Sequence, residues 1–306
     1  MLSVRWFVGD FGSNALMSGC AMDRWLLISN CNTYGLARSL QLQGNSFHLD
    51  CIDVWHFKKN MQDYENEIPT YDRVIINPEV RLTSYDFRSL KNVNEIPNVE
   101  FDAYHPDFCF VGVDGVRLYK PLAACHSMIV LAAFQAGWTP EKTRKLFRRD
   151  IYEQCGFFAR WELARDRLIS SFAAMGMDLS NAFRRWTRGE CFMHGLGHPK
   201  ARPIFDIARI FLKNHVGETN ATDLVPSDTI VDGACLPVYP EIGETIGVRG
   251  SYAFKLPGEY KLISLERFIE MSFEVYQPYN PNEILVEPGF RSRFDRVKQV
   301  ISEAEA

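Results

Sequence analysis

The sequence predicts an α/β protein with a three-layer parallel-sheet core and a helical insertion. Three short apolar runs, each followed by turn residues, fit buried parallel strands: Trp25–Ile28, Ser46–Trp55 and Asp72–Ile76. Beyond residue 120, apolar residues recur at helical spacing. Strands dominate the first third of the chain and helices the rest. This order argues against a nucleotide-binding fold in which strands and helices simply alternate.

Composition narrows the class of protein. The chain has 306 residues, 46% hydrophobic and 24% charged, as in a globular protein with a substantial core. The formal net charge of -4 argues against a duplex nucleic-acid binder. No apolar run approaches the length of about 18 residues that a membrane span requires. The 8 cysteines form no C-x-x-C pair and no secretory signal is visible, which predicts reduced thiols, no metal site and a cytoplasmic location.

The predicted organisation has three parts. Residues 1–24 form an amino-terminal extension rich in glycine and aromatic residues. A single α/β domain covers 25–290 and contains the helical insertion at about 120–190, and residues 291–306 form a charged carboxyl-terminal tail that is helical or frayed.

The first strand and the segment after it predict a strand, a tight turn and a helix. Ser29 to Thr33 are small and polar, and Leu36 and Leu40 then lie on one helix face. Cys31 therefore sits at the carboxyl end of a strand and the amino terminus of a helix, where α/β proteins bind ligands and where a thiolate is stabilised. The residue is either a nucleophile of lowered pKa or a small buried hydrophobe in a turn.

Further strands are expected along the first third. The third strand ends at Asn77, directly before a proline. Asn77, like Asn30 and the backbone N–H groups near Cys31, could donate to an oxyanion, although an asparagine before proline also simply forms turns. Val99–Tyr104 and Phe108–Val113 are additional strand candidates.

The second half of the chain is predicted to be helical. Pro121–Gly137 is apolar nearly all round and contains His126, which is either a satisfied core histidine or a residue pointing into a site. Thr139 caps a following helix that begins at Pro140. The remaining helices are predicted over Ile151–Met175, Asp178–Arg188, Ile204–His215 and Leu265–Tyr276.

A loop over Cys191–Pro199 holds the second candidate catalytic residue. His198 follows two glycines and precedes a proline, so it is either a general base of near-neutral pKa or a loop histidine bonded to backbone. His194 is a weaker candidate, and the glycines between the two histidines argue against a metal-binding helix. The arginines near 160–167 and 184–188 either solvate helix faces or bind phosphates, and no Walker-type loop is present.

Several segments together resemble the WcbI-type polysaccharide biosynthesis proteins. Ile28 to Asn32, followed by a Leu-Ala-x-x-Leu helix, resembles the family's G-N-C-Q opening, and Asp72 to Pro78 resembles its next strand. Tyr119–Thr139 resembles the family's central histidine–serine segment, and Phe192–Pro199 resembles its H-P segment. Leu236–Pro240 resembles its carboxyl-terminal part. Ser29, Asn32 and Gly197 replace the family's glycine, glutamine and asparagine. The Asp-x-x-His motif of SGNH hydrolases is also absent, because Gly195 stands three residues before His198.

The resemblance implies an acyltransferase with a fold related to SGNH hydrolases. Coenzyme A or acetyl-CoA would be the co-substrate, without a metal, and a saccharide or nucleotide sugar the acceptor, in polysaccharide or capsule biosynthesis. Cys31 would occupy the nucleophile position and His198 the base position. The residues expected to hold the oxyanion or position the substrate are Ser29, Asn30, Asn32, Asn77 and His126. The third member of the triad and the phosphate-binding residues have no assignment.

Two other functions fit the same residues. An esterase or deacetylase would use water as the acceptor in place of the sugar. A non-catalytic carbohydrate-binding protein would instead have a structural thiol at Cys31 of ordinary pKa, about 8.5.

Overall fold

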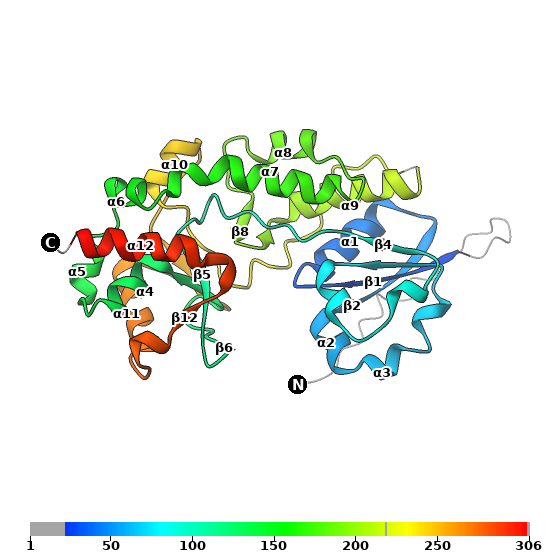
Figure 1. The fold of residues 1–306 in the computed structure, drawn as a ribbon. Coiled ribbons are helices and arrows are strands. Elements are labelled where there is room, and N and C mark those ends of the chain that lie inside the picture. Colours follow the sequence, from blue (N-terminus) through cyan, green and yellow to red (C-terminus); the bar gives the residue numbers. More distant parts are fainter. Residues whose placement is uncertain (1–21, 218, 305–306) are drawn as a thin grey trace. The chain divides into compact units, whose positions relative to one another are not determined.

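A computed structural model describes residues 22–217 and 219–304 (Figure 1). The chain divides into two compact units. The first comprises the described residues up to Asn98 together with Ile207–Pro226, and the second comprises Val99–Asp206 and the residues from Ser227 onward. Most of the predicted amino-terminal extension lies outside the described residues. A compact unit is not by itself a family domain, so the single domain over 25–290 stays a prediction.

The first unit is built on a four-stranded parallel sheet of order β2-β1-β3-β4. Its strands are β1 (Asp23–Ser29), β2 (Phe47–Asp53), β3 (Arg73–Ile76) and β4 (Val93–Glu95). In the central strand, Ile28 is opposite Ile52 on one side and Ile76 on the other. The predicted parallel-sheet α/β class is confirmed, and each of the three predicted apolar strands is present in this sheet.

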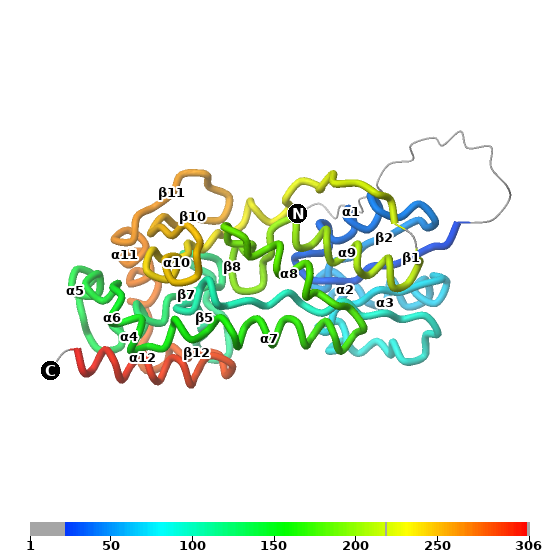
Figure 2. The backbone as a smooth tube through the Cα atoms, turned by 90° about the horizontal axis from the view of Figure 1, so that it is seen from above, coloured from blue at the N-terminus to red at the C-terminus, as the bar shows by residue number. Residues whose placement is uncertain are grey.

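Helices cover both faces of this sheet (Figures 1 and 2). Helix α1 (Thr33–Gln43) follows β1 on one face, and the second half of α9 (Ala201–His215) runs alongside it. Arg209 Nε of α9 donates to Gln43 Oε1 of α1 at 3.0 Å. On the other face, α2 (Val54–Lys59) and α3 (Met61–Tyr64) follow β2. Three 3-10 turns complete the unit: Ile68–Thr70, Pro78–Leu82 and Phe87–Ser89.

The strands of the second unit are short and antiparallel. The longest is β5 (Phe108–Val113), which pairs with β6 (Val116–Arg117), β7 (Cys125–Ser127) and β12 (Leu285–Val286). Two separate hairpins are β8 (Met193–Gly195) with β9 (His198–Pro199), and β10 (Phe254–Lys255) with β11 (Leu262–Ile263). The strand predicted over Phe108–Val113 is therefore present, outside the parallel sheet.

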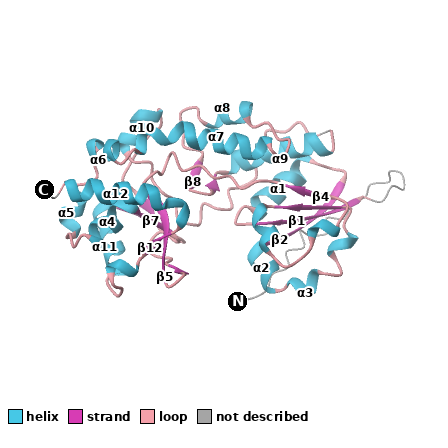
Figure 3. Cartoon of the chain, viewed as in Figure 1, coloured by secondary structure: helices cyan, strands magenta, loops and turns pink. Residues whose placement is uncertain are grey.

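Helices supply most of the second unit (Figure 3). They are α4 (Met128–Gln135), α5 (Pro140–Arg144), α6 (Arg149–Gln154), α7 (Arg160–Ala173), α8 (Ser180–Trp186), α10 (Pro240–Ile246), α11 (Leu265–Tyr276) and α12 (Arg291–Glu303). Three 3-10 turns lie at Phe157–Ala159, Pro281–Glu283 and Pro288–Phe290. The charged tail is thus largely α12, which buries Phe294 and Val297 and packs against α4.

One predicted helix begins later than expected. The pattern over Pro121–Gly137 predicts a single helix, but residues 125–127 form β7 and α4 begins at Met128. Ser127 Oγ accepts from the backbone N–H of Val130, and the carboxylate of Asp107 accepts from that of Ile129. Because these side chains cap the helix, the chain before Met128 is released to pair with β5.

Two further expectations about elements are wrong. The helix predicted over Ile151–Met175 is broken into α6, a 3-10 turn and α7, because Gly156 adopts a left-handed φ of 75°. No strand forms over Val99–Tyr104; there, Phe101 and Tyr104 are buried among aromatic rings instead. Thr139 does cap α5, as predicted, by accepting from the backbone N–H of Lys142.

Candidate functional site

The turn between β1 and α1 is closed by Asn30. Its backbone oxygen accepts from the N–H and the hydroxyl of Thr33, at 2.9 Å and 2.6 Å. Its side-chain oxygen accepts from the backbone N–H of Asn32 at 3.1 Å. These bonds turn the chain immediately after Ser29, so Cys31 is displayed at the tip of the turn while its neighbours are buried.

A chain of carboxamides extends from Asn30 into the rest of the first unit. Asn30 Nδ2 and Asn77 Nδ2 both donate to Asn98 Oδ1, at 2.9 Å and 3.1 Å. Asn98 Nδ2 donates to Glu79 Oε1 at 3.0 Å. Each amide nitrogen of Asn30 and Asn77 carries a second hydrogen that these bonds do not use. The structure thus brings Asn30 and Asn77 together on one shared acceptor.

Two buried acceptors of this cluster have no partner among the described residues. They are the carboxamide oxygens of Asn32 and Asn77. A buried carbonyl without a donor has an unfavourable free energy of about 1–3 kcal/mol, which a ligand N–H or O–H relieves.

The thiol of Cys31 does not have the lowered pKa that its place at a helix terminus predicts. Burial raises the pKa of Cys31, the backbone N–H of the same residue lowers it by less, and the charge of Glu79 raises it further. The thiol is therefore protonated at neutral pH. The helix terminus is outweighed because removal from water disfavours the charged thiolate.

His198 lies in the second unit, on the β8–β9 hairpin, where it is opposite Gly195. In the predicted loop, Gly195 ends β8 and Gly197 lies in the turn that leads to β9. Burial lowers the pKa of His198, and the charge of His194 lowers it further. A neutral imidazole at pH 7 can accept a proton, which is what a general base requires.

His194 has two partners that the sequence pattern did not indicate. Its Nε2 lies 2.7 Å from Asp228 Oδ2, and its Nδ1 lies 3.5 Å from Cys235 Sγ. Asp228 and Cys235 are more than thirty positions away in the chain, as the sequence separations of 34 and 41 show. No local motif could have revealed them.

His126 is enclosed in the second unit. The side chain is fully buried, its Nδ1 lies 2.9 Å from the hydroxyl of Tyr276, and its Nε2 lies 3.3 Å from the backbone oxygen of Leu118. Burial lowers its pKa to about 4, so the ring is neutral. Both nitrogens are occupied, and this arrangement is that of a satisfied core histidine.

The expected site residues are therefore divided between the two units. Ser29, Asn30, Cys31, Asn32 and Asn77 gather at the carboxyl ends of β1 and β3 in the first unit. His198 and His126 belong to the second unit.

Three of the six arginines considered for phosphate binding contact acidic side chains. Arg160 contacts Asp102 at 2.7 Å, Arg185 contacts Asp206 at 3.3 Å, and Arg165 pairs with Glu162. In the described part of the chain, no group of three or more His, Cys, Asp or Glu residues is arranged to hold a metal ion. Within the same residues, no helix is both long and apolar enough to cross a membrane.

Comparison with known proteins gives a family match and a fold match. The family model for the polysaccharide biosynthesis enzyme WcbI matches residues 24–217. A solved structure of WcbI, described as the native protein without a disulfide bond between coenzyme A and a cysteine, is similar with a TM-score of 0.62. The two sequences are 14% identical, and the similarity covers 91% of this chain and 96% of the other. No curated protein matches the chain.

Proposed function

The chain belongs to the WcbI family of polysaccharide biosynthesis enzymes, and we propose that it transfers an acyl group from acetyl-CoA to a hydroxyl of a saccharide or nucleotide sugar. The observation that carries the proposal is the exposure of the residue Cys31 at the tip of the turn between β1 and α1, in the unit that also holds two carboxamide oxygens without donors among the described residues. A WcbI structure whose description mentions coenzyme A supports the choice of donor.

We infer that the pantetheine end of coenzyme A binds at Cys31. That arm carries two amide N–H donors and ends in sulfur. The unpartnered oxygens of Asn32 and Asn77 are acceptors for such N–H groups. The second amide hydrogens of Asn30 and Asn77 would stabilise the negative oxygen that develops on the thioester carbonyl.

The raised pKa of Cys31 favours direct transfer over an acyl-cysteine intermediate. In the direct route the acceptor oxygen attacks the thioester carbon, and the carbon–sulfur bond to coenzyme A breaks. The hydroxyl loses its proton as it attacks, and the departing thiolate takes up a proton; the resemblance to the family assigns the role of base to His198. Cys31 would contact the donor sulfur and fix the thioester. The lowered pKa of His198 keeps its imidazole ready to accept the proton.

The test is release of coenzyme A from acetyl-CoA in the presence of a panel of nucleotide sugars. We expect turnover that depends on the acceptor, a loss of about 100-fold or more in His198→Gln, and a smaller loss in Cys31→Ala. Full activity in Cys31→Ala would exclude a role for the thiol. His126→Gln is not a suitable control because it disturbs the core, whereas Cys191→Ser lies outside the proposed machinery and should leave turnover unchanged.

Two further measurements separate the related reactions. Intact-protein mass spectrometry after mixing with acetyl-CoA should show no acetyl group on Cys31 if transfer is direct. Calorimetry should show binding of coenzyme A to the protein. Ester cleavage without affinity for coenzyme A would instead identify a hydrolase and contradict the transferase assignment.

A further inference from the structure

The second unit contains a cysteine–histidine–aspartate cluster that the proposed acyl transfer does not use. His194 lies between its two partners: Asp228 Oδ2 is 2.7 Å from Nε2, and Cys235 Sγ is 3.5 Å from Nδ1. Because the partners occupy opposite edges of the ring, the three side chains do not converge on one point as metal ligands would. They form a relay in which the carboxylate orients the imidazole toward the thiol.

Backbone bonds hold each member of the cluster. The N–H and oxygen of Cys235 exchange hydrogen bonds with Lys255 at 3.1 Å and 3.3 Å, and the N–H of Leu236 donates to the oxygen of His194 at 2.8 Å. Asp228 accepts from the backbone N–H of Ile230 and, more weakly, from that of Ala201 at the start of α9. The thiol sulfur also lies 3.9 Å from the oxygen of Val231. The geometry is therefore fixed by several parts of the unit.

The charges of the cluster favour an imidazolium. Burial lowers the pKa of His194, but the hydrogen bonds and charges of Asp228 and Cys235 outweigh it and raise that pKa to about 9. The pKa of Asp228 is lowered overall. Burial raises it, but the hydrogen bonds from His194 and the backbone lower it by more. His105 and His198 are the nearby histidines, and the pKa of each is lowered, so neither competes for the positive charge. A cationic ring beside a sulfur stabilises the thiolate.

For the other cysteines of the described residues, burial rather than a neighbouring cation dominates the pKa of the thiol. Burial is the largest cause that raises the thiol pKa at six positions: Cys31, Cys51, Cys109, Cys125, Cys155 and Cys191. For Cys191, on the segment just before the hairpin that carries His194, the pKa rises to about 11. Cys235 is partly exposed, so reagents in solution can reach it.

The surroundings of Cys235 suit attack on sulfur better than attack on a carbonyl. Acyl transfer needs hydrogen-bond donors for an oxyanion, but the N–H groups of Cys235 and Leu236 already donate to Lys255 and His194. Exchange with a disulfide needs only an accessible thiolate and a proton for the departing sulfur. The imidazolium of His194 supplies that proton.

We propose that Cys235, His194 and Asp228 form a thiol–disulfide exchange site that takes low-molecular-weight disulfides. The thiolate of Cys235 attacks one sulfur of the disulfide, whose sulfur–sulfur bond breaks as a new one forms. The released thiolate takes the proton of His194 and departs as a thiol. Cys235 is thereby oxidised to a mixed disulfide, the other half of the reagent is reduced, and no further oxidant is consumed. The inference does not rest on the acyl-transfer proposal.

The experiment uses the full-length reduced protein and glutathione disulfide as the probe. At pH 7, peptide mass spectrometry over time should show glutathione on Cys235 before any other described cysteine, and Cys235→Ser should abolish this early adduct. His194→Gln, which cannot be a cation, should slow the modification of Cys235 about tenfold. Cys191→Ser is the matched control and should leave the rate unchanged.

The pH profile distinguishes an activated thiol from a merely exposed one. With His194 present, the rate at Cys235 should exceed the rate in His194→Gln most strongly at pH 6–7, where the imidazole carries its proton. In His194→Gln the rate should instead rise through the ordinary thiol range near about pH 8.5. Asp228→Asn should give an intermediate profile and provides a second variant if the first does not fold. Equal rates at Cys235 and Cys191 in the wild-type protein, or a profile unchanged by both variants, would overturn the proposal.

Discussion

Asn98 donates its amide hydrogen to Glu79 at 3.0 Å, and this bond fixes the orientation of the whole carboxamide cluster beside Cys31. A carboxylate only accepts hydrogen bonds when ionised, so the nitrogen of Asn98 must face Glu79 and its oxygen must face Asn30 and Asn77. The direction of each amide around the turn therefore depends on one acidic side chain.

Asn98→Ala should destabilise the first unit. Three partners lose a buried or partly buried hydrogen bond, and we expect a decrease of about 1–3 kcal/mol in the free energy of unfolding measured by urea titration. Asn92→Ala is the control, because the side chain of Asn92 makes one exposed hydrogen bond, to the backbone oxygen of Asp72. An Asn98 variant no less stable than the Asn92 variant would show that the cluster does not support the turn.

Asp107 should make stability depend on pH. Burial raises its pKa from 3.8 to about 6, despite hydrogen bonds from Ser127, Ile129 and Tyr239 that lower it. Because the folded pKa is raised, the contribution of this group to stability is complete below pH 4 and is lost as the pH rises through about 6.

The uncharged variant Asp107→Asn should not show this loss. Relative to the variant, the wild-type protein should lose about 3 kcal/mol in the free energy of unfolding between pH 4 and pH 7. Urea titrations at several pH values measure the difference, and parallel curves for the two proteins would contradict the assignment.

Asp102 joins two arginines of the second unit. Arg160 and Arg293 contact its Oδ2 at 2.7 Å and 2.8 Å, and all three side chains are mostly buried. The pKa of Asp102 is lowered overall. Burial raises it, but the two arginines lower it by more. Asp102→Ala leaves two buried cations without their carboxylate and should cost about 3–5 kcal/mol in the free energy of unfolding.

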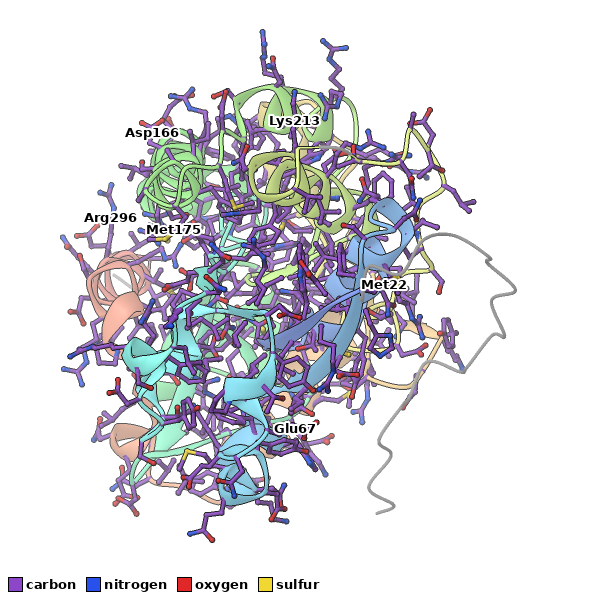
Figure 4. The ribbon with its side chains drawn as sticks, turned by 90° about the vertical axis from the view of Figure 1, so that its right-hand side faces the viewer. Met22, Glu67, Asp166, Met175, Lys213 and Arg296 are labelled. Atoms are coloured by element: carbon purple, nitrogen blue, oxygen red, sulfur yellow. The ribbon has the colours of Figure 1, made fainter. Side chains whose placement is uncertain are left out.

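The matched control for Asp102 is an exposed aspartate that also contacts an arginine. Asp166 lies on the outer side of α7 and pairs with Arg165 (Figure 4). Its replacement by alanine should change the free energy of unfolding by less than about 1 kcal/mol. If the two substitutions change the free energy of unfolding by similar amounts in the same urea assay, the buried ion pairs of Asp102 do not stabilise the fold.

Gly250 should not tolerate a side chain. A Cβ at this position would lie 2.5 Å from the Cα of Pro240 and 2.8 Å from the backbone oxygen of Tyr239. Since both are backbone atoms, relief requires movement of α10, and Gly250→Ala should lower the free energy of unfolding by about 1–3 kcal/mol. Gly289→Ala meets no atom within 4 Å and should be nearly neutral in the same thermal or urea measurement.

The strand–turn–helix around Cys31 could be predicted because its signals are local. Apolar residues from Trp25 to Ile28 and the helical spacing of Leu36 and Leu40 give β1 and α1 directly. The helix predicted over Leu265–Tyr276 has the bounds of α11, and in the structure Ser264 caps it by accepting from the backbone N–H of Arg267. By contrast, β4 contains a single apolar residue, Val93, and is defined by pairing with β3, which no local pattern records.

The parts of the site that were missed depend on contacts between distant residues. Asn98 completes the cluster at Cys31 from a position 68 residues away from Asn30. Asp228 and Cys235 contact His194 only in the folded chain, because they are distant from it in the sequence. For Cys31, the sequence shows the helix terminus, which lowers a thiol pKa, but not the burial that raises the pKa in the structure.

The first unit is discontinuous along the chain, and this governs how the protein can be dissected. Its residues up to Asn98 and its segment Ile207–Pro226 are separated by about a hundred residues of the other unit. A fragment ending at Asn98 would lack Arg209 and Asn220, which bond to Gln43 and Leu42 at the end of α1. Isolating this unit requires a spliced gene in which a short linker rejoins the two segments, whereas simple truncation would remove part of its own scaffold.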